Sequence, residues 1–412
     1  MSILLTIFEP IKNYPINPLK HITLLLAVIL SITAFSQKES EKKNYIQPEY
    51  FIGKVLPNYA DTFPKTGLQH GFSLNFGSQN TDTNSWARYY NYAESGVMLN
   101  YANFGNNEVF GHQFSINPYV SFPVFNKAQS DYHLKIGMGI SYFTTHFDST
   151  TNYTNNMIGS AFTWEFKLFL YRNLMATESF NLRMGFGFSH ESNGHTVMPN
   201  MGINSALLSL SGQFYKKKNN LFETPKRIKG KNHSEKKLFI HVRKGIGWHG
   251  QNGSEGPKEN RILPVYASSF GAGYIYNKHL KLRAGLTYKF YEQYRTHLTE
   301  NNIEGLSENP NLSASAFVFY IGNEFLMSHV SMDVELGVNL HKPFYRHYHP
   351  SSKIAVVPMK LIATRLGVNL YLFNTNKLPK HNFFVGGTIN ANFGKADFTE
   401  FSLGYTCVFN KH

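Results

Sequence analysis

Cysteine and long apolar runs are both scarce in this chain of 412 residues. The single cysteine, Cys407, has no second cysteine to pair with, which excludes an internal disulfide framework. The most apolar segment, Ile22 to Phe35, is shorter than the roughly 20 residues that a membrane-spanning helix needs, and no longer apolar run follows it. The fold must therefore be held by packing and hydrogen bonds, without disulfides or spanning helices.

Acidic residues are also few, with 26 Asp and Glu against 40 Lys and Arg, and the formal net charge is +14. A basic chain can indicate nucleic-acid binding, but no recognition module is present. Much of the excess charge lies in one polar stretch, Lys216 to Lys237, which has the composition of a long solvated connection. No Cys/His cluster has the spacing of metal ligands. We therefore expect no nucleic-acid partner, no metal and no cofactor.

The N-terminal region has the layout of a cleaved secretory signal. Lys20 and His21 precede the apolar segment, which ends in Ala34-Phe35-Ser36 before Gln37. No cysteine stands at the expected cleavage point, so a lipid anchor is not expected. We predict that residues 1–36 are a signal peptide and that residues 37–70 form an N-terminal periplasmic segment.

Apolar and polar residues alternate in segment after segment from about residue 130 onward. One face of each segment is aromatic or aliphatic and the other carries glycine or polar residues, as in the ranges 132–142, 158–170, 280–288 and 330–338. Side chains alternate across a strand, so the pattern predicts β-strands, although it alone also fits a soluble sandwich with one wet face. Export, strands of about ten or more residues, and 15% aromatics with 32 glycines favour a transmembrane barrel.

About fifteen candidate strands can be counted, whereas a bacterial barrel with both ends in the periplasm needs an even number. The short first candidate, near 71–77, is the one most readily dropped. We predict an all-β fold, an antiparallel up-and-down barrel of the Gram-negative outer membrane with about 14 strands (about 12–16) over residues 71–412. No separate globular domain is expected.

Strand parity orients this barrel. If the last strand descends to a periplasmic C-terminus, the connection after His190 lies outside the cell, with the long loops near 248–262, 292–311 and 341–360. Short connections, such as the one at 277–278, then lie in the periplasm, as is usual for such barrels.

The strand predicted over 179–190 leads into the most informative motif. His190 and Ser192 continue the apolar face that begins at Leu182, and at 3.3 Å per residue they lie about 7 Å apart along the chain. A serine hydroxyl is a weak nucleophile until a neighbouring imidazole takes its proton. The pair therefore predicts a nucleophile and a base that face lipid.

The run from His190 to Asn204, HESNGHTVMPNMGIN, resembles the H-x-S-N … P-N-x-G-I-N signature of the lipid A 3-O-deacylase (PagL) family of outer-membrane barrel enzymes. Residues 142–148 and 156–160 are similar to the longer branch of this family in Bacteroidetes, often labelled acyloxyacyl hydrolase. The resemblance covers roughly residues 50–216. Residues 217–412, expected to extend the barrel, match no motif.

The resemblance implies an ester hydrolase that removes the 3-hydroxyacyl chain at position 3 of lipid A in the outer leaflet. Ser192 would be the nucleophile, His190 the general base and Asn193 the donor to the oxyanion. Asn204 stands where the best-known pattern has a glutamate that orients the histidine. An asparagine carbonyl can hold an imidazole but does not stabilise its charged form, so weakened and lost activity both stay open. Glu191 is expected to point inward, away from this group.

Some residues of the same motif are predicted to have structural and not chemical roles. Pro199, Asn200, Gly202 and Ile203 are predicted to shape the turn and its packing, and His195 to be a loop residue. The alternative function is a non-enzymatic outer-membrane pore or structural barrel that keeps a degenerate hairpin. A wall of about fourteen strands favours that alternative, because its lumen stays water-filled unless loops or side chains plug it.

Overall fold

The computed structural model describes residues 42–57, 63–82, 85–124, 130–216, 235–250, 262–348 and 357–409. These residues belong to one compact unit, Glu41–His412. The predicted signal peptide and nearly all of the lysine-rich stretch, residues 217–234, lie outside the described residues.

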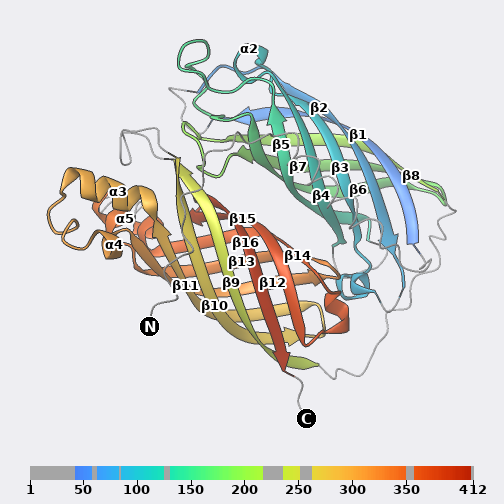
Figure 1. The fold of residues 1–412 in the computed structure, drawn as a ribbon. Helices are drawn as coiled ribbons and strands as arrows, with labels where there is room; N and C mark the ends of the chain where they lie inside the picture. The colour runs from blue at the N-terminus through green and yellow to red at the C-terminus, as the bar shows by residue number, and fades with distance from the viewer. Residues whose placement is uncertain are drawn as a thin grey trace, which may run out of the picture. The chain divides into compact units, whose positions relative to one another are not determined.

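The first eight strands close into an antiparallel barrel (Figure 1). Closure comes from the pairing of the first strand with the eighth, which runs from Tyr45 opposite Tyr215 to Leu56 opposite Asn204. The strands are β1 (Lys42–Leu56), β2 (Gln69–Asn80), β3 (Glu94–Asn103), β4 (His112–Pro123), β5 (Tyr132–Phe143), β6 (Phe162–Ala176), β7 (Phe180–Ser192) and β8 (Ile203–Tyr215).

The second eight strands close into a barrel of their own, in which β16 pairs with β9 from Thr399 opposite Trp248 to Phe409 opposite Leu238. Its strands are β9 (Lys236–Gly250), β10 (Ile262–Tyr276), β11 (Leu280–Tyr291), β12 (Ser315–Met327), β13 (Val330–His341), β14 (Ile362–Tyr371), β15 (His381–Asn392) and β16 (Lys395–Phe409).

Helices are short and lie in the connections. No helix in the described part of the chain has the length and apolar character needed to cross a membrane. The helices are η1 (Trp86–Tyr90), α2 (Asn107–Phe110), α3 (Glu292–Asn301), α4 (Pro310–Ser313), α5 (Pro343–Tyr348), α6 (Val357–Leu361) and η2 (Thr375–Lys377).

The all-β antiparallel prediction is correct, but the prediction of one barrel of about 14 strands is wrong. Period-two alternation reveals which face of a strand is wet, and it carries no information about which strand closes on which. The expectation of a non-barrel segment over 37–70 is also wrong, because β1 (Lys42–Leu56) pairs with β2 and β8. Pro48 and Lys54 interrupt the apolar outward face of β1 and concealed the strand in the sequence. The candidate near 71–77 is part of a full strand, β2.

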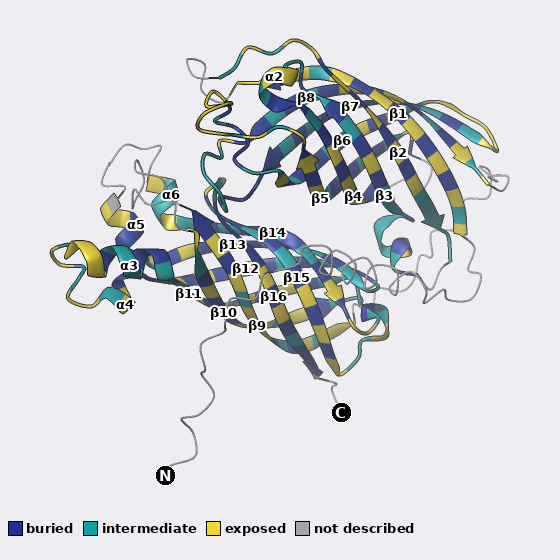
Figure 2. Ribbon diagram, turned by 45° about the horizontal axis from the view of Figure 1, so that its top comes forward, coloured by how far each residue is buried: buried dark blue, intermediate teal, exposed yellow. Residues whose placement is uncertain are grey.

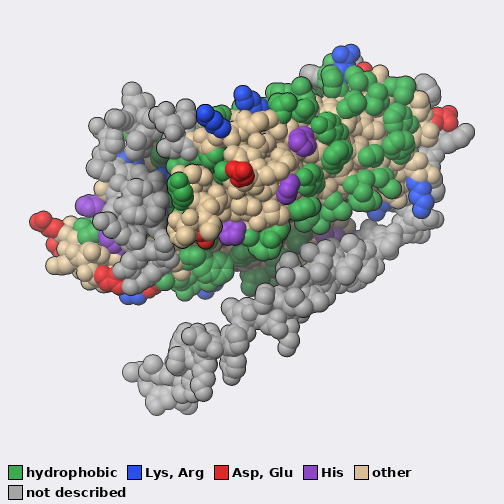
Figure 3. Space-filling model, turned by 90° about the horizontal axis from the view of Figure 1, so that it is seen from above, with side chains coloured by type: hydrophobic (Ala, Val, Ile, Leu, Met, Phe, Trp, Pro, Cys, Tyr) green, Lys and Arg blue, Asp and Glu red, His purple; other side chains and the backbone are tan. Residues whose placement is uncertain are grey.

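Burial in the strands is inverted relative to a water-soluble protein. On β7 the outward Met184 and Phe186 are 49% and 63% exposed, whereas the inward Arg183 and Glu191 are at most 1% exposed. Figure 2 shows the same alternation of buried and exposed positions along the strands, and Figure 3 shows hydrophobic side chains over much of the visible outer surface. An apolar exterior and a polar interior are what a lipid-embedded barrel requires.

Charged side chains fill the lumen of the first barrel. The Arg183 guanidinium donates to both carboxylate oxygens of Glu94, at 3.0 and 2.8 Å. Tyr171 donates to Glu49 at 2.6 Å, and the Lys135 ammonium lies 3.9 Å from the same carboxylate. An interior of eight strands is only wide enough for side chains to fill, so these pairs occupy the lumen and leave no wide channel.

The second lumen holds a denser ionic network. Arg283 lies 2.6 Å from Asp333 and 2.7 Å from Glu335. Arg243 and Arg365 bind the same acids, at 2.7 Å to Glu335 and 2.8 Å to Asp333. A pore through this wall would have to break several buried ion pairs, each costly to separate in a low-dielectric interior.

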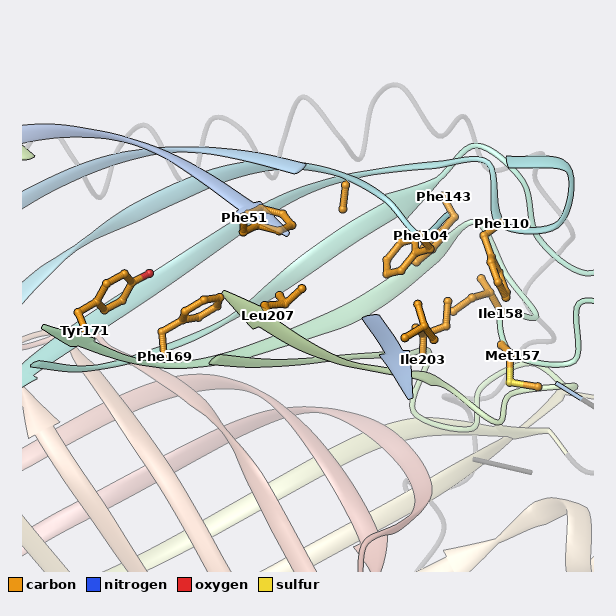
Figure 4. Close-up of a cluster of buried hydrophobic side chains, with 12 residues drawn as sticks. Phe51, Phe104, Phe110, Phe143, Met157, Ile158, Phe169, Tyr171, Ile203 and Leu207 are labelled. Carbon is orange, nitrogen blue, oxygen red and sulfur yellow. The ribbon is translucent and has the colours of Figure 1, made fainter. Parts of the chain in front are cut away.

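An apolar plug closes the first barrel at the end where β8 begins. Phe104, Phe110, Phe143, Ile158 and Ile203 are all fully buried there, in a cluster that continues along the lumen (Figure 4). Ile203 is the first residue of β8, so the plug anchors the base of the β7–β8 hairpin.

Candidate active site on the hairpin between β7 and β8

The hairpin of residues 193–202 joins β7 to β8. Every residue of the predicted site lies in this hairpin or in the last or first residues of the two strands. In the register of the two strands, His190 lies opposite Asn204. On the other side of β7, Ser192 lies opposite Trp164 and His190 opposite Phe166 of β6. The pairing brings the ends of three strands to one point on the barrel wall.

His190 is held by Asn204, as the alternation of the two strands predicted. The imidazole Nδ1 and the Asn204 Oδ1 are 2.7 Å apart. A carboxamide oxygen only accepts, so Nδ1 donates this hydrogen bond. In the neutral tautomer that this bond favours, Nε2 has the lone pair and can accept a proton.

Ser192 is buried at the end of β7, at 5% exposure, and its hydroxyl oxygen receives two donors. The backbone N–H of Gly194 donates to Oγ at 3.2 Å and the side chain of Asn200 donates through Nδ2 at 2.9 Å. Within the described residues no hydrogen bond joins Ser192 to His190. Such bonds are often long before substrate binds, and the two side chains stand two residues apart on one strand.

The donor groups of Asn193 are engaged within the turn. Its side-chain Nδ2 donates to the carbonyl of Val197 at 2.7 Å and to the hydroxyl of Ser160 at 3.1 Å, and its Oδ1 accepts from the N–H of Thr196 at 3.2 Å. Its backbone N–H donates to Asn200 Oδ1 at 3.0 Å. Asn193 thus holds the turn together with both its side chain and its main chain.

Asn200, which the sequence predicted only to shape the turn, also contacts the serine. Besides donating to Ser192, its Oδ1 accepts from the N–H of Asn193. The two bonds orient the amide so that its NH₂ group faces the serine. The signal in the sequence was the P-N-x-G-I-N motif itself, which places an asparagine eight residues after the serine.

Gly202 approaches the imidazole closely. A Cβ at this position would lie 3.0 Å from His190 Cε1 and 2.9 Å from the carbonyl oxygen of Glu191, and the backbone has a φ of +72°. Both the left-handed conformation and the missing side chain let the hairpin close over the histidine.

A second loop of the same barrel, residues 144–161, supports the hairpin. The N–H of Gly202 donates to the carbonyl of Met157 at 3.0 Å, and the N–H of Met201 donates to the carbonyl of Asn156 at 3.2 Å. The hydroxyl of Ser160 receives the Asn193 amide. The motif residues 156–160 therefore act as a support for residues 193–202.

Glu191 lies inside the barrel, as predicted. It is fully buried and lies opposite Glu165 in the register of β6 and β7. The Glu191 side chain points into the lumen, whereas His190 faces out. Glu191 therefore does not replace the glutamate that the family pattern has at the position of Asn204.

Comparison with known proteins assigns the two barrels separately. Residues 71–212 match the family described as lipid A 3-O-deacylase (PagL), and residues 238–411 match the C-terminal domain of acyloxyacyl hydrolases. No curated protein matches the chain.

Solved structures give weaker likenesses. The outer membrane enzyme PagL is 17% identical over 40% of this chain and 97% of its own, with a TM-score of 0.29. The outer membrane protein opdK of Pseudomonas aeruginosa is 10% identical over 90% of this chain and 99% of its own, with a TM-score of 0.20. The family assignment depends on the two family models and not on these low scores.

Proposed function

Because the chain belongs to the lipid A 3-O-deacylase (PagL) family and continues into the acyloxyacyl hydrolase C-terminal domain, we propose that it is an outer-membrane hydrolase of the 3-O-linked 3-hydroxyacyl ester of lipid A. One observation carries the mechanism. A serine at the end of a wall strand receives two N–H donors, beside a histidine whose second nitrogen is held by Asn204.

The first half of the reaction is acyl transfer. His190 Nε2 takes the proton of Ser192 as Oγ attacks the ester carbonyl, and the imidazolium then protonates the leaving sugar oxygen. Gly194 N–H and Asn200 Nδ2, which donate to Oγ before the attack, are the proposed donors to the oxyanion that forms beside it. In comparable sites one such donor contributes roughly 3–4 kcal/mol to lowering the barrier. Water activated by His190 then releases the fatty acid.

The apolar wall beside the site suits a lipid substrate. Outward side chains of β7 and β8, including Phe186 and Leu208, are 63% and 55% exposed and face the hydrocarbon layer. Acyl chains that lie along this wall reach Ser192 without leaving the membrane.

The pore alternative loses its main support, because neither lumen is that of a fourteen-stranded wall and both hold packed charged side chains. A non-enzymatic structural barrel stays as the second candidate, favoured by Asn204 in place of a glutamate. Lipid A mass spectra with and without the gene separate the two.

The first prediction tests the nucleophile and the base. Ser192→Ala and His190→Ala should each lower the release of 3-hydroxy fatty acid from purified lipopolysaccharide by roughly 10³-fold or more, because each removes a group that acts in the transition state. Ser189→Ala, an inward-facing serine of the same strand, is the matched control. Activity close to wild type in Ser192→Ala would reject the mechanism.

The second prediction concerns the group that orients His190. Asn204→Ala should lower kcat about tenfold or more, and Asn204→Glu should preserve or raise it, because a carboxylate also stabilises the imidazolium. Steady-state kinetics in detergent give the comparison. Unchanged turnover in both variants would show that another group holds the imidazole.

The third prediction separates Asn200 from Asn193. Asn200→Asp keeps the acceptor for the Asn193 N–H but removes the donor to Ser192, so kcat should fall about 10²–10³-fold with KM little changed. In the Asn200→Ala variant, kcat should decrease by the same factor. An active Asn200→Asp variant would remove Asn200 from the oxyanion site.

The fourth prediction tests orientation. Tyr153 in the loop beside the hairpin is 69% exposed, and Ser179 is exposed in the β6–β7 turn at the opposite end of the same barrel. In a Cys407→Ser background, Tyr153→Cys should react with an impermeant maleimide on intact cells, and Ser179→Cys only after permeabilisation. The reverse result would place the site at the phospholipid leaflet and favour a phospholipase.

A further inference from the structure

Thr399, on β16, hydrogen-bonds to two neighbours of Ser192: its partner on the adjacent strand and the residue that follows it in the sequence. The indole Nε1 of Trp164, which pairs with Ser192 across β6 and β7, donates to Thr399 Oγ1 at 3.1 Å. The Thr399 hydroxyl in turn donates to the carbonyl of Asn193 at 3.4 Å. The Thr399 hydroxyl thus links Trp164 of β6 to Asn193, the residue after Ser192.

The burial of Thr399 shows how closely the hairpin covers it. Phe401 and Leu403 follow on the same outward face of β16 and are 52% and 69% exposed, as lipid-facing residues are. Thr399 is only 6% exposed. A Cβ added to Gly194 would lie 2.3 Å from Thr399 Oγ1, so the turn approaches the strand as closely as a glycine allows.

The end of β9 makes a second, independent contact with the same turn. The N–H of Gly250 donates to the carbonyl of His195 at 3.1 Å. The ring of His249 stacks on that of His195, with centroids 5.1 Å apart and planes inclined by 17°. His249 is itself fixed, because Gln293 of α3 bonds to its Nδ1 at 3.1 Å.

From these contacts we propose that the C-terminal barrel positions the catalytic turn, with Thr399 as the positioning residue. The inference rests on the proposed function. Residues 193–196 contain no regular hydrogen-bond ladder, yet they must hold the Gly194 N–H at Ser192. The loop 144–161 contacts Asn193, Met201 and Gly202. The end of β9 contacts His195, and Thr399 of β16 holds the carbonyl of Asn193, whose peptide group includes the Gly194 N–H.

The energetic reason is preorganisation. A catalytic group displaced by a fraction of an ångström loses much of its effect, and a turn free to sample other conformations spends part of its time in unproductive ones. Thr399 contacts neither Ser192 nor His190 by hydrogen bond, so its effect must pass through the carbonyl of Asn193 and the indole of Trp164. This gives the second barrel a role in catalysis without a catalytic residue.

The test is Thr399→Val, which keeps the branched shape and removes the hydroxyl. Loss of this bridge should lower kcat for lipid A about three- to tenfold, the scale of one or two hydrogen bonds, with KM nearly unchanged. Thr399→Ser should restore most of the activity. Thr388→Val is the matched control, because Thr388 is fully buried in the same barrel and its hydroxyl has no hydrogen-bond partner among the described residues.

A second measurement tests the reactivity of Ser192 with a reagent that does not need the lipid-binding surface. A small fluorophosphonate should label Ser192 of the wild type, and the labelling rate should fall in Thr399→Val by a factor similar to that of kcat. Thr399→Ala, which removes the same hydroxyl with less bulk, is measured in parallel so that a folding defect in one variant does not decide the result. Heat-modifiable migration in gels monitors folding.

The outcomes distinguish the two proposals. A wild-type protein that is active and labelled, with folded Thr399→Val and Thr399→Ala proteins equal to it, overturns the positioning role alone. A wild-type protein that neither cleaves lipid A nor reacts at Ser192 overturns the proposed function and the positioning role together.

Discussion

The constraint on which this structure depends is the need to satisfy every backbone N–H and C=O within a hydrocarbon layer. Without water, only a closed ladder does so, and each barrel achieves it when its first strand pairs with its eighth. Eight strands leave an interior just wide enough for side chains. In the described part of the chain, ion pairs and aromatic rings fill that space, and the candidate site lies on the outer wall and its connecting loops.

The candidate site lies where the ladder of β7 and β8 ends. The strands fix His190 and Asn204 opposite each other, because they belong to the regular register. Ser192 is the last residue of β7, and the donors to its hydroxyl come from the irregular turn. His190 is therefore positioned by the barrel wall, whereas the donors to Ser192 are positioned by loop contacts that the wall does not supply.

This division is the physical basis of the role that we propose for the second barrel. A turn of ten residues costs conformational entropy to hold in one shape, and the longer the loop, the more contacts it needs. The loop 144–161 holds one part of it and the ends of β9 and β16 hold another. A buried glutamate, Glu191, lies on the same strand as His190, but its side chain faces the lumen, opposite Glu165, and not the histidine.

Local alternation in the sequence determined the strand faces, the outward direction of His190, the inward direction of Glu191 and the contact of His190 with Asn204. Each follows from the two-residue period of a strand and the short hairpin that joins β7 to β8. The same reasoning predicted an antiparallel barrel with a lipid-facing site. Only the tertiary structure decided the closure into two barrels of eight, the inclusion of β1, and the hydrogen bonds that Asn193 and Asn200 make. Those features depend on hydrogen bonds between residues distant in sequence, or on turn geometry that has no period, and neither leaves a pattern in the order of residues.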